Sequence, residues 1–218
     1  MNKVLNIDCY EYMKTLPDKF FDIVVTDPPY GINVVNKNGQ IGNSNKKLKY
    51  RNIYKPIIND DIKLDLSELF RVSKNQIIFG GNYFNLSISK GWIVWDKKCQ
   101  NDWDDNFSDG EMAWTSFDRP LKIYRQLYMG FVQKGKREIR CHPTQKSVNL
   151  MKWIIKNYTK ETDVIFDPFA GSGSTLVASK QLNRKYIGCE LDKNYFDITT
   201  KRLKEIDNTE HNFFNSNT

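Results

Sequence analysis

Histidine and cysteine are scarce in this chain of 218 residues, and their scarcity excludes several kinds of site. The only histidines are His142 and His211, so a metal site built from several histidines is impossible, and a Ser-His-Asp triad would have to use one of these two. The four cysteines lie far apart without a C-x-x-C pair, which argues against a zinc site and a disulfide framework. We expect four reduced thiols and no bound metal.

Long apolar runs are also missing from the sequence. None approaches the roughly 18–20 residues that a membrane-spanning helix needs, and the N-terminus has acidic residues where a signal peptide is apolar. Hydrophobic residues make up 39% of the chain and charged residues 27%, which is typical of a folded soluble protein rather than a disordered one. We therefore expect one compact cytoplasmic domain with no membrane partner.

Acidic residues are rare in two segments where basic residues gather. Residues 31–58 carry six Lys or Arg and no acid, and residues 119–142 carry seven and a single acid, so each segment has a net charge of +6. The whole chain has a net charge of +7, which leaves −5 on the remainder. Two basic segments on an acidic body favour a polyanionic partner such as nucleic acid; lysine-rich loops that are merely solvated are the alternative.

Apolar β-branched runs alternate with helical spacing along the chain, which predicts an α/β fold with a parallel sheet. We expect strands at 4–7, 20–26, 76–79, 91–95, 163–166 and 185–189, and helices at 9–16, 62–72, 144–158, 174–182 and 192–206. Residues 111–131 fit either strands or a helix, and 207–218 look like a frayed polar tail. The acidic stretch 101–111 lacks the glycine of a calcium loop and is interpreted as a solvated loop.

A glycine-rich turn near the C-terminus suggests a nucleoside site. Gly171 and Gly173 follow an expected strand and open a helix, and Glu190 ends the next strand, where a carboxylate can accept hydrogen bonds from both ribose hydroxyls. The third glycine of the dinucleotide fingerprint is replaced by Leu176, which disfavours NAD and FAD. S-adenosylmethionine, a nucleoside without phosphate, fits better; a dinucleotide or a purely structural turn are the alternatives.

Asp27-Pro28-Pro29-Tyr30 is a stiff, extended segment at the end of a predicted buried strand, where ligands bind in open α/β sheets. Asp27 and the Pro28 carbonyl can accept the two protons of an exocyclic amino group, and Tyr30 can stack on the ring that carries it. Hydrogen bonds to both protons favour a tetrahedral nitrogen whose lone pair attacks a methyl group. A rigid proline turn without chemistry is the alternative.

Three motifs in order, TDPPYG at 26–31, HPTQKS at 142–147 and FDPFAGSGST at 166–175, resemble those of the β-group amino DNA methyltransferases of the N-4/N-6 DNA methylase family. The resemblance covers residues 1–206. It implies a Rossmann-like methyltransferase fold with a mostly parallel twisted sheet, helices on both faces and a circularly permuted motif order. It also implies methyl transfer from S-adenosylmethionine to the N6 of adenine in DNA, by direct attack of a flipped base and without a metal.

Other activities stay open beside this one. N4-cytosine transfer is the alternative within the family, whose cytosine enzymes usually have serine in place of Asp27. An RNA substrate is not excluded by the sequence. A NAD-dependent oxidoreductase is the alternative from a different class, although Leu176 counts against it.

The resemblance assigns roles residue by residue. It makes Asp27, Pro28, Pro29 and Tyr30 the catalytic motif, and it places the cofactor on Asp8, His142, Thr144, Lys146, Asp167, Phe169, Gly171, Gly173 and Glu190. Asp8 would contact the adenine, Glu190 the ribose, and the 142–146 segment the methionine part. Two positions depart from the family, Ser147 for proline and Ile7 for glycine, and Asp8 has the alternative role of an N-cap.

The two basic segments are the expected DNA contacts of a single catalytic domain, 1–206. Residues 31–58 would be a mobile basic loop that closes over double-stranded DNA, and 119–142 a compact target-recognition segment. The candidate contacts are Lys37, Lys46, Lys47, Lys49, Arg51 and Lys55 in the first, and Arg125, Lys134, Lys136 and Arg137 in the second. Family members often form homodimers or serve beside a cognate restriction endonuclease, and the sequence leaves both partnerships open.

Overall fold

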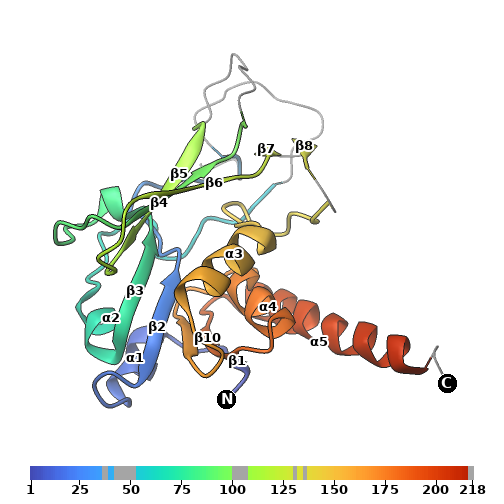
Figure 1. Ribbon diagram of the computed structural model, residues 1–218. Coiled ribbons are helices and arrows are strands. Elements are labelled where there is room, and N and C mark those ends of the chain that lie inside the picture. The colour runs from blue at the N-terminus through green and yellow to red at the C-terminus, as the bar shows by residue number, and fades with distance from the viewer. Residues whose placement is uncertain (36–38, 42–52, 100–107, 130–131, 135–136, 216–218) are drawn as a thin grey trace.

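The computed structural model describes residues 1–35, 39–41, 53–99, 108–129, 132–134 and 137–215, and the side chains as far as Asp207 (Figure 1). Its centre is an eight-stranded sheet with the order β1-β10-β9-β2-β3-β5-β4-β6. The strands are β1 (Lys3–Leu5), β2 (Phe21–Thr26), β3 (Ser73–Phe79), β4 (Trp92–Asp96), β5 (Gly110–Thr115), β6 (Lys122–Arg125), β9 (Val164–Asp167) and β10 (Lys185–Cys189). A separate hairpin pairs β7 (Tyr128–Met129) with β8 (Val132–Gln133).

One strand of the sheet runs against the others. β5 is antiparallel to both of its neighbours, β3 and β4, whereas every other pairing in this sheet is parallel. The start of β5 therefore lies at the same edge as the carboxyl ends of the parallel strands. In open α/β sheets, ligands bind at the carboxyl ends of the parallel strands. Because β5 is reversed, residues near its start can also reach a site at that edge.

Helices cover both faces of the sheet. α1 (Cys9–Lys14) and α2 (Ser67–Val72) lie on one face, and α3 (Val148–Tyr158), α4 (Ser174–Gln181) and α5 (Lys193–Asn215) on the other (Figure 1). Alternate residues of β2 join different cores, since Ile23 packs with the α3–α4 side and Val24 with the α1–α2 side. The predicted α/β fold with a mostly parallel sheet and helices on both faces is confirmed.

Several predicted element boundaries are wrong. The helix expected at 62–72 begins only at Ser67, because Leu64 and Leu66 are buried in a non-helical segment and the Asp65 carboxylate accepts the Ser67 N–H. The helix expected at 144–158 begins at Val148, capped by the Ser147 hydroxyl.

Further along, the segment 111–129 contains strands rather than a helix, namely most of β5 and all of β6 and β7. The last helix continues to Asn215 instead of fraying after Ile206. Nothing between 207 and 215 breaks a helix, as the segment has neither glycine nor proline.

From the few, widely spaced cysteines and the lack of long apolar runs, the sequence predicts reduced thiols and no membrane-spanning helix. The four cysteines are free thiols, two of them, Cys9 and Cys189, buried. Across the described ranges, no helix is both long enough and apolar enough to cross a membrane.

Candidate active site

A cavity of about 1070 Å³ opens along the carboxyl edge of the sheet. Pockets for a single small molecule usually measure roughly 300–1,000 Å³, so this cavity is at the upper end of that range. Its walls come from the segments after β1, β2, β9 and β10, from the start of β5, and from residues 140–146. We call its two parts the Glu190 end, with Asp8, His142, Phe169, Gly171 and Tyr195, and the Asp27 end, with Tyr30, Tyr83, Lys97, Glu111 and Lys146.

The glycine turn and Glu190 meet at the Glu190 end, as the sequence predicts. Gly171 has a φ of +54°, and its N–H donates to Glu190 Oε2 at 2.7 Å. The other oxygen of Glu190 accepts the Asp192 N–H at 2.8 Å. Burial raises the pKa of Glu190 to about 7 despite these two donors, and the residue lines the cavity.

Two predicted cofactor residues are not among those that line the cavity. The Asp167 carboxylate accepts the Thr26 hydroxyl at 2.8 Å and the Phe169 N–H at 3.2 Å, and burial raises its pKa to about 6. Gly173 starts α4 with a φ of +78°, and a Cβ there would lie 2.5 Å from the Thr199 side chain. Both residues shape the turn that presents Phe169 and Gly171 to the cavity.

Asp8 is the N-cap of α1, which was the alternative role considered for it, and it also lines the cavity. Its carboxylate accepts the Tyr10 N–H at 2.7 Å and so caps α1, and the residue also lines the Glu190 end of the cavity. The Tyr10 ring lies edge-on to Phe169, with ring centroids 6.4 Å apart. This places an aromatic wall beside the cap.

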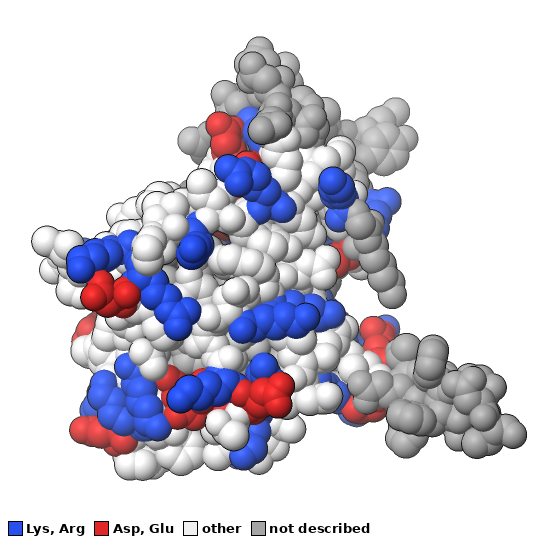
Figure 2. Space-filling view, in the orientation of Figure 1, with Lys and Arg blue, Asp and Glu red and all other residues white. Residues whose placement is uncertain are grey.

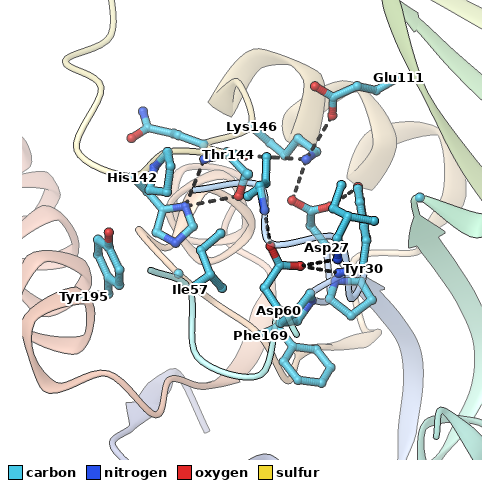
Figure 3. A pocket seen from close by; sticks show the side chains of 18 of the residues that line it. Asp27, Tyr30, Ile57, Asp60, Glu111, His142, Thr144, Lys146, Phe169 and Tyr195 are labelled. Atoms are coloured by element: carbon cyan, nitrogen blue, oxygen red, sulfur yellow. Dashed lines mark hydrogen bonds and ion pairs between the residues drawn. The ribbon is translucent and has the colours of Figure 1, made fainter. Parts of the chain in front are cut away.

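His142, at the Glu190 end, lines the cavity together with Thr144. The Thr144 N–H donates to His142 Nδ1 at 3.3 Å, and the imidazole ring packs against Tyr195 with centroids 4.3 Å apart (Figure 3). Burial and then the Lys146 charge lower the pKa of His142 to about 3. The ring is therefore neutral at physiological pH and acts as a packing and hydrogen-bonding group rather than a cation.

The Asp27 end is built on the rigid proline segment. Asp27 Oδ1 accepts the Tyr30 hydroxyl at 2.5 Å, and Oδ2 lies 2.5 Å from Lys146 Nζ. The Tyr30 ring stacks on Tyr83, with centroids 4.7 Å apart and an interplanar angle of 12°. It also lies so close to Gly80 that a Cβ there would clash with it, so only glycine fits at that point.

Asp60, which the sequence analysis did not single out, holds the chain just after the proline segment. It is 3% exposed, and its carboxylate accepts four backbone N–H groups, from Tyr30 (3.0 Å), Gly31 (3.1 Å), Ile32 (3.4 Å) and Val34 (2.7 Å) (Figure 3). Its carbonyl accepts the Asn33 N–H as well. A single acidic residue therefore fixes the turn that follows Tyr30. No local motif marks it, because its partners lie about 30 residues earlier.

Lys146 and Glu111 form contacts that the sequence analysis did not predict. Lys146, expected against the cofactor, is 6% exposed and forms ion pairs with Asp27 and with Glu111 Oε2, the latter at 2.9 Å (Figure 3). Glu111 was expected in a solvated acidic loop, and this is wrong: it stands in β5 and also pairs with Lys97 at 2.9 Å. The reversed direction of β5 brings it to the cavity.

The charges at the Asp27 end determine how its groups ionise. Burial disfavours the charged form of Glu111, but the Lys146 and Lys97 ammonium groups outweigh it and lower the pKa of Glu111 to about 2. For Asp27, burial outweighs Lys146 and raises the pKa above its usual range. Burial lowers the pKa of Lys146, yet the two carboxylates more than compensate, so the lysine stays protonated.

The candidate DNA contacts are only partly within the described residues. Lys37, Lys46, Lys47, Lys49, Arg51 and Lys136 lie outside them. Lys55, Arg125, Lys134 and Arg137 are exposed, and Arg125 lies 3.5 Å from Asp96 at the end of β4.

Basic side chains also occur elsewhere on the surface. Figure 2 shows them mixed with acidic ones over the lower part of the molecule, where α1 and α2 lie and where Lys14 and Arg71 have acidic partners. Charge alone therefore does not mark a single binding face in that view.

Comparison with known proteins gives this arrangement a family. Residues 87–201 match the DNA methylase family, a range that includes the 142–147 and 166–175 motifs and begins after the proline segment. The type II methyltransferase M.HinfI of Haemophilus influenzae is 28% identical over 94% of this chain and 69% of its own length.

Two solved structures share the fold. The complex of M1.HpyAVI with SAM has 25% identity and a TM-score of 0.57, over 92% of this chain and 98% of that one. The cytosine-N4-specific PvuII DNA methyltransferase has 14% identity and a TM-score of 0.58, over 92% of this chain and 85% of that one. Because the family match extends over more than half of its residues, this chain belongs to the N4/N6 DNA methylase family.

Proposed function

We propose that this protein transfers a methyl group from S-adenosylmethionine to the N6 amino group of adenine in double-stranded DNA. The observation that carries the proposal is the position of the Asp27 carboxylate. Asp27 lines the same cavity as Glu190, and the volume of that cavity is at the upper end of the range for small-molecule pockets. One end can then hold the nucleoside of the methyl donor while the other receives a base.

The residues at the Glu190 end fit S-adenosylmethionine. Glu190 lines the cavity and would accept from two ribose hydroxyls, and its backbone partners at Gly171 and Asp192 hold it in place. Neutral His142 adds no positive charge that would repel a sulfonium ion. When bound, S-adenosylmethionine supplies the methyl group as an electrophilic carbon on sulfur.

Asp27 acts on the attacking amino group. Its carboxylate and the Pro28 carbonyl accept the two N–H protons, which makes the nitrogen lone pair available for attack. The nitrogen forms its bond to the methyl carbon as the carbon–sulfur bond breaks and the electron pair remains on sulfur. The nitrogen then loses one proton, with Asp27 as the nearest acceptor. Catalysis is mainly alignment and hydrogen bonding that strengthens in the transition state.

The target base must leave the duplex to reach this carboxylate. Unstacking costs about a few kcal/mol, which stacking and phosphate contacts can offset. The stacked rings of Tyr30 and Tyr83 offer the aromatic surface for the extruded base. The choice of adenine rests on Asp27, since the fold is shared with a cytosine-N4-specific enzyme and does not discriminate between the two bases.

Labelled S-adenosylmethionine incubated with genomic DNA, followed by nucleoside analysis, tests the proposal. We expect the label in N6-methyladenine. Label in N4-methylcytosine would keep the methyl transfer but overturn the base assignment. Label in RNA alone, in a parallel incubation, would overturn the DNA substrate, and no label in either would overturn the activity.

The basic segments can be tested by the salt dependence of DNA binding. Removing one lysine that neutralises a phosphate should make the slope of log K against log salt shallower by about 0.9. We expect the joint change of Lys46, Lys47 and Lys49 to glutamine to make the slope shallower by roughly 2 to 3, because up to three phosphates would no longer be neutralised. An unchanged slope would contradict their role. Homodimerisation and a restriction endonuclease partner stay predictions.

A further inference from the structure

Four charged side chains form a row at the Asp27 end of the cavity. Lys97 Nζ lies 2.9 Å from Glu111 Oε1. Glu111 Oε2 lies 2.9 Å from Lys146 Nζ, and Lys146 Nζ lies 2.5 Å from Asp27 Oδ2 (Figure 3). They come from three separate places in the chain: the segment directly after β2, the β4–β5 region and the segment before α3. Cations and carboxylates alternate, so the row as a whole is electrically balanced.

Charge balance alone does not explain this row. Asp27 and Lys146 already neutralise each other, and the pair of Lys97 and Glu111 adds no net charge. Removing ions from water is unfavourable, and buried ion pairs are often no more stabilising than apolar residues of the same size. Yet the side chains of Lys97 and Lys146 are only 15% and 6% exposed. The Lys97–Glu111 pair has a different effect: it gives Lys146 a second anionic partner, so that the charge of Lys146 is shared between Asp27 and Glu111.

We infer that Glu111 is a positioning residue for methyl transfer: it holds Lys146 between two carboxylates and thereby keeps Asp27 a strong hydrogen-bond acceptor for the target amino group. This inference rests on the proposed function, because it concerns the same reaction. It assigns a role to a residue of β5 that lies outside the three sequence motifs.

The reason is the competition for the Asp27 oxygens. Both already accept a hydrogen bond, Oδ1 from the Tyr30 hydroxyl and Oδ2 from Lys146. If Lys146 had no other anionic partner, its full charge would act on Asp27 and weaken the carboxylate as an acceptor. Lys146 Nζ also lies 2.9 Å from Glu111 Oε2, so Glu111 shares the ammonium charge with Asp27.

The sign of the effect on Asp27 follows from Coulomb's law. A negative neighbour raises the pKa of a carboxyl group and a positive one lowers it. Loss of the Glu111 charge should therefore lower the pKa of Asp27, and loss of the Lys97 charge should raise it. The charged or titratable groups around Asp27 come from its own segment, β4–β5, the segment before α3, and β9: Tyr30, Lys97, Glu111, His142, Lys146 and Asp167.

The two opposite changes are the test. In Glu111→Gln, we expect the carboxyl ¹³C titration of Asp27 in the protein without ligands to move down by about one pH unit, and in Lys97→Met to move up. The Asp27 signal is assigned by its loss in Asp27→Asn. We expect the single-turnover rate of methyl transfer in Glu111→Gln to fall about tenfold at pH 8, with binding of S-adenosylmethionine unchanged. Glu111→Asp, which keeps the charge, should restore part of the rate.

A matched control lies two residues away. Asp109 has the same charge and also pairs with a lysine, Lys98, but its side chain is 84% exposed. Asp109→Asn should leave the Asp27 titration in place. If it moves the titration as far as Glu111→Gln does, the contact with Lys146 is not the cause and the inference fails.

The remaining outcomes separate the inference from the proposed function. If the unaltered protein transfers no label to DNA, the proposed function fails. If it does, and Glu111→Gln changes neither the Asp27 titration nor the rate, the inference alone is overturned. A shifted titration with an unchanged rate overturns the positioning role as well. Should Glu111→Gln not fold, the direction of the Lys97→Met shift decides.

Discussion

The two ends of the cavity are built in different ways. At the Glu190 end the glycine turn and Glu190 belong to one strand-turn-helix-strand unit, and the Glu190 carboxylate is held by backbone N–H groups. At the Asp27 end the groups come from distant segments, and the carboxylates are held by lysines and a tyrosine. A site for a nucleoside needs directional acceptors, whereas a site that activates an amine needs a controlled charge.

Removal of the Asp27 carboxylate should have the largest effect on the methylation rate, and this effect should be confined to the Asp27 end of the cavity. We expect Asp27→Ala to reduce the single-turnover rate by at least about a hundredfold, the size of effect seen when one transition-state hydrogen bond is removed. Binding of S-adenosylmethionine, measured by calorimetry, should change little because Glu190 is intact. A normal methylation rate would remove Asp27 from the mechanism.

Removal of the Glu190 charge should affect the other end. Hydrogen bonds to charged groups contribute about 1.5–3 kcal/mol, so we expect Glu190→Gln to weaken binding of S-adenosylmethionine about 10- to 100-fold. At a saturating concentration of the donor the rate should recover, unlike in Asp27→Ala. Glu161→Gln is the matched control, since the Glu161 side chain is 89% exposed. An equal loss in both variants would contradict the assignment.

The pH dependence of S-adenosylmethionine binding distinguishes the Glu190 end from the Asp27 end further. The pKa of Glu190 is about 7, so its carboxylate becomes protonated as the pH falls through neutrality and can no longer accept from both hydroxyls. We expect affinity to decrease from pH 8 to pH 6, and the decrease to disappear in Glu190→Gln. A decrease that persists in this variant would point to Asp167, whose pKa is about 6.

The smallest effect is expected at Asp60, which acts through the backbone. Asp60→Asn replaces one acceptor oxygen where four N–H groups converge, and we expect it to reduce the free energy of unfolding by about 1–2 kcal/mol. The rate should fall by less than in Asp27→Ala, with donor affinity unchanged. Denaturant unfolding and single-turnover assays of Asp60→Asn and of exposed Asp61→Asn would measure this difference. Equal behaviour of the two variants would argue against Asp60 as the anchor.

The Glu190 end could be predicted from the sequence to a greater extent than the Asp27 end. The glycine turn and Glu190 lie within one strand-turn-helix-strand unit, so their meeting at Gly171 could be predicted from local spacing. Asp167 and Gly173 belong to the same motif yet are not among the lining residues. This could not be predicted, because the spacing of a motif does not say which of its residues border the cavity. Lys146 was placed with the cofactor, since nothing in its own segment indicates Asp27, 119 residues earlier.

The sequence by itself determined the fold class, the alternation of strands and helices, and the two motifs whose chemistry lies within a few consecutive residues. Local sterics and hydrophobic periodicity suffice for these features. Only the tertiary structure decided that Glu111 and Asp60 belong to the site. Glu111 reaches the site because β5 is antiparallel to its two neighbours. Asp60 reaches it because the chain returns to Tyr30, whose N–H donates to the Asp60 carboxylate. Both depend on contacts between distant residues, where strand direction and charge pairing, rather than local spacing, set the geometry.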